Sequence, residues 1–76
     1  MKAEKKIFLE REDDLKKALV FLTNNSIEKL VLNIPRDSIL GSKPNNFQTL
    51  KKESSKFRKE LVVESIDDHI LELAAL

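Results

Sequence analysis

Residues 29–34 read KLVLNI, and Pro35 follows them directly. The run carries apolar side chains on both faces of a strand, which is typical of an interior strand in a parallel sheet. Because proline has no N–H to donate to a strand ladder, the strand is predicted to end before Pro35.

Two further strands are predicted on either side of this run, at residues 5–10 and 61–65, where side chains alternate between two faces. Apolar residues at helical spacing predict helices over 15–22, over 44–59 and from 66 onward. The order is therefore βαβαβα. This order predicts an α/β fold with a three-stranded parallel sheet and right-handed crossovers, similar to half of a Rossmann or flavodoxin-like fold.

The two faces of the predicted sheet differ in composition. One face is apolar, and the first two helices are expected to cover it. It consists of Ile7, Leu9, Leu30, Leu32, Ile34, Leu61 and Val63. The other face is apolar only in its middle, at Phe8, Val31 and Val62, so the last helix is expected to cover it thinly. Faces this unequal favour the strand order 1-2-3 over the order 2-1-3, which would need two equally apolar faces.

Acidic residues occur where helices are expected to begin. Glu12, Asp13 and Asp14 precede the first helix, where carboxylates meet free N–H groups and the positive end of the helix dipole. Ser65 and Asp68 have the spacing of a capping box at the start of the last helix. Helix capping is therefore one complete explanation of these side chains.

The same acids also suggest a metal site. Asp13 and Asp14 follow the first predicted strand, and Asp67 and Asp68 follow the third. Loops at the carboxyl ends of parallel strands share one edge of the sheet, and Mg²⁺ prefers oxygen ligands such as carboxylates. A Mg²⁺-binding or receiver-like regulatory domain is thus an alternative prediction, and no other cofactor is indicated.

The segment after Pro35 contains the only glycine of the chain, in the sequence Gly41-Ser42-Lys43. A phosphate-binding loop needs a second glycine, and Pro44 stands where a helix N–H should point at the phosphate. The segment is therefore predicted to be a connector. Within it, Ile39 and Leu40 are expected to pack under a helix edge or, as an alternative, to form an exposed contact; Arg36 is a further contact candidate.

The composition excludes several classes of protein. A chain of 76 residues predicts one domain, residues 1–76. The absence of cysteine excludes disulfides and thiolate metal sites and fits a reducing compartment, so a cytoplasmic location is expected. No apolar run reaches the length of a membrane span, and the charged start MKAEKK does not match a signal peptide.

The charge balance and the single histidine limit the function further. Fourteen basic and thirteen acidic residues give a net charge of +1, which argues against a dedicated nucleic-acid binder. Weak nucleic-acid binding, in which the lysines of the second helix contact phosphate backbones, stays an alternative prediction. His69 has no cysteine or serine-elbow partner with which to form a catalytic triad, so no enzyme is predicted.

Three stretches together resemble a small α/β domain of uncharacterised bacterial proteins. They are LVLNIPRDSIL at 30–40, NNFQTLKKESSKFRKELVVES at 45–65, and DDHILELAAL at 67–76. The resemblance implies no catalytic residues. It implies a module that often precedes a membrane segment or a longer extracellular part, and therefore a piece excised from a larger protein.

The favoured prediction is a non-catalytic interaction or structural module of a larger protein. Its expected partner is another protein or a second copy of the chain. The candidate contacts are Phe8, Val31 and Val62 on the second sheet face, and Arg36, Ile39 and Leu40 in the connector.

Overall fold

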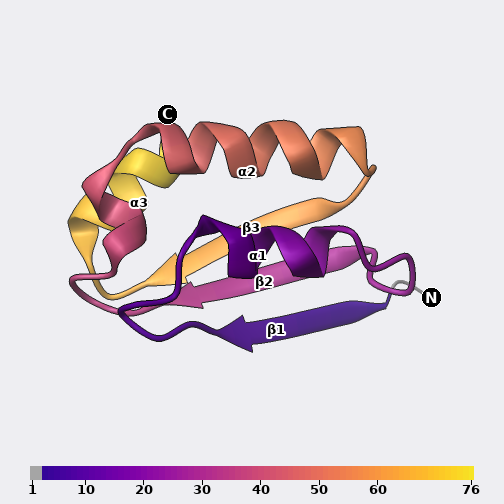
Figure 1. Ribbon diagram of the computed structural model, residues 1–76, viewed down its shortest axis with the longest axis horizontal. Helices are drawn as coiled ribbons and strands as arrows, with labels where there is room; N and C mark the ends of the chain where they lie inside the picture. The colour runs from indigo at the N-terminus through magenta and orange to yellow at the C-terminus, as the bar shows by residue number, and fades with distance from the viewer. Residues whose placement is uncertain (1–2) are drawn as a thin grey trace.

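The computed structural model describes residues 3–76 and confirms the α/β architecture (Figure 1). The strands are β1 (Glu4–Phe8), β2 (Lys29–Ile34) and β3 (Glu60–Ser65). The helices are α1 (Leu15–Leu22), α2 (Asn45–Lys56) and α3 (Asp68–Ala75), and a short 3-10 helix, η1 (Ile39–Ser42), precedes α2. The elements alternate in the predicted βαβαβα order.

The three strands form one parallel sheet in the order β1-β2-β3, which confirms the predicted strand order. Lys29 lies between Glu4 and Glu60 in the register, and Leu32 lies between Ile7 and Val63. The side chains of residues that are paired across neighbouring strands point to the same side of the sheet. The register therefore assembles the two unequal faces expected from the alternation.

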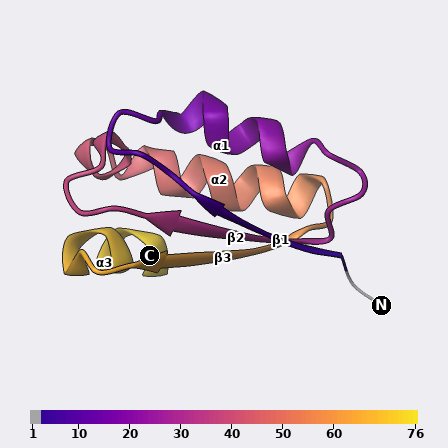
Figure 2. The same cartoon turned by 90° about the horizontal axis from the view of Figure 1, so that it is seen from below.

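The apolar face carries the core. Figure 2 shows α1 and α2 on the same side of the sheet, as two right-handed crossovers in this strand order require. Helix α1 packs against β2, and α2 packs against β3 and α1. The buried cluster includes Ala18, Leu22, Leu30, Leu32, Ile34, Leu40, Phe47, Leu50 and Ile70.

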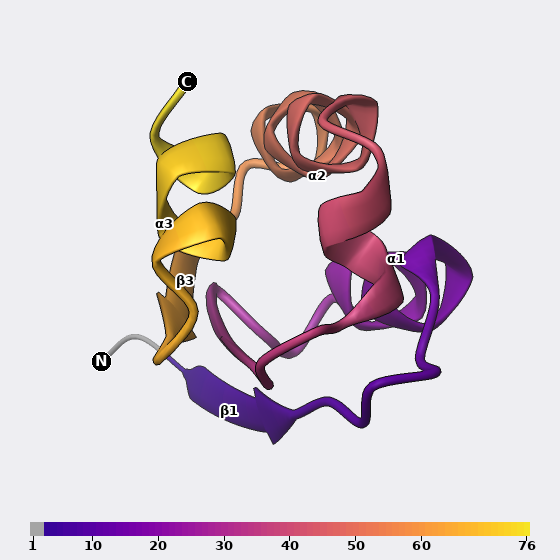
Figure 3. The ribbon, with the colours of Figure 1, turned by 90° about the vertical axis from the view of Figure 1, so that its left-hand side faces the viewer.

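The last helix is not where we expected it. Instead of covering the second face, α3 lies over β3 on the side of α2, and it also contacts η1 (Figure 3). Ile70 is only 1% exposed and belongs to the same core cluster as Leu40 and Phe47. The prediction was wrong because the apolar stripe of α3 joins the core through Ile70, whereas the second face carries ion pairs that offer little apolar surface.

Local signals explain where the helices begin and end. The Asp14 side chain accepts the N–H of Lys17 and caps α1, as predicted. The cap of α3 is Asp67 rather than Ser65; the Ser65 hydroxyl instead accepts the N–H of Asp67. Helix α2 ends at Lys56, earlier than expected, because Arg58 adopts a left-handed conformation with φ 56°.

Candidate functional site

The acids proposed as metal ligands follow the two outer strands. Asp13 and Asp14 come after β1, and Asp67 and Asp68 come after β3, while β2 runs between those strands. Within residues 3–76, no three His, Asp or Glu side chains form a group that could hold a metal ion. The expected convergence of carboxylates at one edge of the sheet is therefore not seen.

Asp13 has a local role at the start of α1. Its Oδ2 accepts the N–H of Glu10 at 2.7 Å and a hydrogen bond from the Lys17 ammonium at 3.1 Å. The bond from Glu10 and the contact with Lys17 lower the pKa of Asp13 below its ordinary value. The carboxylate thus closes the turn between β1 and α1.

Asp67 connects two loops at the carboxyl ends of the strands. Its Oδ2 accepts the N–H of Asp37 at 3.2 Å, and its Oδ1 accepts the N–H of His69 at 3.0 Å. These backbone donors, that of Asp37 first, lower the pKa of Asp67. Asp37 adopts a left-handed conformation with φ 61°, so this carboxylate holds an uncommon backbone turn against the start of α3.

The glycine of the connector is needed for close packing. A Cβ atom at Gly41 would lie 2.7 Å from Cδ1 of Ile70. The ring Nε2 of His69 lies 3.2 Å from the carbonyl oxygen of Gly41, so both neighbouring residues of α3 approach this position. The segment is a 3-10 turn that docks α3, in keeping with its prediction as a connector.

The contact candidates of the connector differ in exposure. Arg36 is exposed and Ile39 is 45% exposed, whereas Leu40 is completely buried in the core. The Ser38 hydroxyl accepts the N–H of Leu40 at 3.1 Å, which orients that side chain inward. Only Arg36 and Ile39 are therefore available to a partner.

Ion pairs cross the second sheet face. Lys6 of β1 reaches Glu64 of β3 at 2.8 Å, across the middle strand. Lys29 contacts carboxylate oxygens of both Glu4 and Glu60 at 3.3 Å. The contact with Lys6 lowers the pKa of Glu64, and the two glutamates raise the pKa of Lys29.

The apolar part of this face is small. Phe8 is 67% exposed, but Val31 is only 6% exposed and Val62 is half-buried. Within residues 3–76 no helix packs on this side of the sheet, as Figure 2 shows. The paired charges therefore leave Phe8 as the prominent apolar side chain of an otherwise polar surface.

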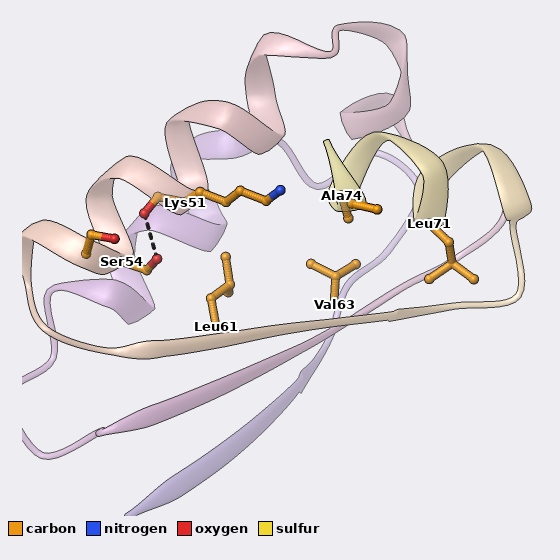
Figure 4. Close-up of a pocket in the computed structure, with 8 residues that line it drawn as sticks. Lys51, Ser54, Leu61, Val63, Leu71 and Ala74 are labelled. Atoms are coloured by element: carbon orange, nitrogen blue, oxygen red, sulfur yellow. Dashed lines mark hydrogen bonds between the residues drawn. The ribbon is translucent and has the colours of Figure 1, made fainter.

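A second surface with apolar side chains lies between α2, α3 and β3. Here the three elements enclose an open groove of about 500 Å³. In Figure 4, Leu61 and Val63 form its floor, Leu71 and Ala74 form one wall, and Lys51 extends from α2 toward α3. Its full lining is Lys51, Ser54, Ser55, Leu61, Val63, Leu71, Ala74 and Ala75.

Sequence reasoning missed this groove because it assigned Leu61 and Val63 to the covered core. Both residues are only half-buried, since the small Ala74 and Ala75 leave space above β3. The available signal was an alanine pair in the last helix together with the apolar run LVV at 61–63.

Comparison of the chain with protein-family models, with curated proteins and with solved structures gave no match. A search of the described helices found none that combines the length and apolar character needed to cross a membrane. The assignment of a function therefore depends on the geometry, and the groove between α2, α3 and β3 is the candidate site that we consider.

Proposed function

We propose that this chain is a non-catalytic module of a larger protein, and that it binds another protein through the groove between α2, α3 and β3. The observation that carries this proposal is the apolar lining of the groove, to which Leu61, Val63, Leu71, Ala74 and Ala75 contribute. Accessible apolar grooves with few polar groups are typical of surfaces that bind a partner.

The chemistry of the groove supports binding rather than catalysis. Lys51 is the only charged residue of its lining. The Ser54 hydroxyl donates to the main-chain oxygen of Lys51 at 2.8 Å, and no histidine or carboxylate of the lining stands beside it as a base. A nucleophile and base pair would be needed for acyl or phosphoryl transfer at this place.

The two alternative functions stay predictions. Mg²⁺ binding would require ligands drawn from acids that already cap helices or close turns. Nucleic-acid binding through α2 would depend on exposed Lys52 and Lys56, which share the helix with Glu53. No specific observation favours either function over protein binding.

Site-specific cross-linking tests the proposal. A photoreactive residue replaces Ser55 in the groove, and the matched control replaces Lys52, which is exposed on the same helix but does not line the groove. We expect a protein adduct from position 55 in a lysate of the source cells and none from position 52. Equal adducts from both positions, or none from position 55, would contradict a role for the groove.

A further inference from the structure

The outer edge of β3 has unpaired backbone groups. The N–H of Glu60 donates to the main-chain oxygen of Glu28, the residue before β2, at 2.9 Å. The backbone groups of Glu60 therefore point toward β2. Because backbone groups alternate in direction along a strand, the N–H and C=O groups of Leu61 and Val63 point away from β2. Among the strands of residues 3–76, β3 pairs only with β2, so these groups have no strand partner.

This edge lacks the features that normally prevent strand addition. Natural edge strands are protected by lysines, prolines, bulges or inward-pointing charges. The centre of β3 is Leu61-Val62-Val63, and its two glutamates lie on the second face, where they pair with Lys29 and Lys6. The edge therefore presents an apolar strand that another strand can join.

The groove begins directly beside this edge. Side chains of an added strand that point to the helix side would stand next to Leu61 and Val63 and enter the groove. Lys51 extends over the same space (Figure 4), and its ammonium contacts the main-chain oxygen of Leu76. A cation above an apolar floor matches a ligand that is mostly apolar and carries one negative charge.

We propose that an extended segment of another protein, apolar at alternate positions and bearing a carboxylate, adds to β3 as a fourth strand. Main-chain hydrogen bonds to Leu61 and Val63 supply affinity, and the groove selects the alternate side chains. The carboxylate pairs with Lys51 in place of the oxygen of Leu76. This inference rests on the proposed function, because it names the partner of the same groove.

Selection from a displayed library of short random segments tests the partner chemistry. We expect enriched segments to alternate Val, Ile or Leu with polar residues and to contain Asp or Glu. The substitution Lys51→Met should weaken their binding about tenfold, and Lys52→Met should leave it unchanged. Enrichment of basic segments, or equal effects of the two substitutions, would overturn the proposed chemistry.

N-methylation tests the strand geometry without altering the protein. Methyl groups on the alternate segment amides that face β3 should abolish binding, and methyl groups on the outward amides should not. In amide NMR spectra, the unmodified segment should shift the amide signals of Leu61, Val63 and Leu71. The amide signal of Lys6 in β1 should not change. Binding that tolerates both methylation patterns would overturn strand addition.

Edge substitutions in the protein give a second readout. Val63→Pro removes an outward N–H of β3, and Lys6→Pro removes the corresponding outward N–H of β1. Only the first should prevent binding, with folding followed by circular dichroism. If sedimentation instead shows a dimer that Val63→Pro abolishes and Lys6→Pro does not, a second copy occupies the edge and the proposal fails. A cross-link at position 55 with methylation-tolerant binding would retain the proposed function and remove only strand addition.

Discussion

The two edge strands of the sheet, β1 and β3, both pair only with β2, yet they meet solvent in different ways. β1 reads EKKIF and is exposed at four of its five positions. β3 reads ELVVES and is half-buried at every position after Glu60. Lys5 of β1 shares its side of the sheet with apolar Ile7, which places a charge among the inward-facing positions.

This difference indicates that position in a sheet does not determine how an edge behaves. Charges along β1 make it a poor template for another strand, whereas β3 is apolar at its centre and pairs only with β2 among the strands of residues 3–76. Composition thus protects the β1 edge, and the proposed partner would join the β3 edge.

The largest effect is expected from Ile70→Ala. Ile70 is 1% exposed and anchors α3, so its truncation should lower the free energy of unfolding by about 2–5 kcal/mol. Chemical denaturation measures this loss. Hydrogen exchange should show that the substitution speeds the opening of α3 and β3 more than that of β1, because only the β3 side depends on this helix.

Phe8→Ala is the control for that substitution. Phe8 is a comparable apolar side chain at the end of β1, but it is 67% exposed, so the change in the free energy of unfolding should stay within about 0.5 kcal/mol. A loss from Phe8→Ala as large as that from Ile70→Ala would contradict the difference between the two edges.

A smaller loss is expected from Gly41→Ala. The added Cβ would stand 2.7 Å from Cδ1 of Ile70, so α3 or its side chain must shift, at a cost of about 1–3 kcal/mol. Thermal unfolding measures the change. Combining Gly41→Ala with Ile70→Val, which shortens the opposing side chain, should recover part of the loss; full additivity of the two losses would argue against this contact.

A pH-dependent effect is expected from Asp67→Asn. The pKa of Asp67 is lowered from its ordinary value of 3.8 in the folded state, so its stabilising contribution is present above that pH. The contribution is lost as the pH falls through the lower folded value. Unfolding midpoints of the wild type and the variant should therefore differ near neutral pH and converge in strong acid; a constant difference would contradict the role of the charge.

The smallest effect is expected from Mg²⁺. The acids after β1 and those after β3 follow opposite edge strands, and within residues 3–76 no three such side chains are placed to hold a metal ion together. Excess Mg²⁺ should therefore leave the amide signals of Asp13 and Asp67 unchanged, as K⁺ at equal ionic strength does. A saturable shift specific to Mg²⁺ at both residues would restore the metal-binding alternative.

The fold was predictable because short-range patterns specify it. The run at 29–34 matches β2 at both ends, and the alternation in 5–10 and 61–65 predicts the two sheet faces. Strand order followed from the unequal composition of those faces. These signals depend on periodicity and composition, which a single sequence contains.

The candidate site was much less predictable, because it depends on where α3 docks. The stripe containing Ile70 predicts a helix with one apolar side, but it does not specify which surface that side will cover. The surface that α3 covers depends on the space that α2 leaves above Val63 and on the close approach of Gly41 to Ile70. Such distances are properties of the assembled core, so neither the groove nor the orientation of Lys51 could be inferred from residue spacing.

The central position of β2 also has a consequence for local unfolding. Each ladder of the sheet includes β2, so either outer strand can detach while the other ladder persists, but separation of β2 removes both. The amides of Leu30 and Leu32 face β3, so they should stay protected from exchange when β1 opens locally, whereas those of β1 should exchange through such local openings. The domain is therefore expected to open first at its charged strand.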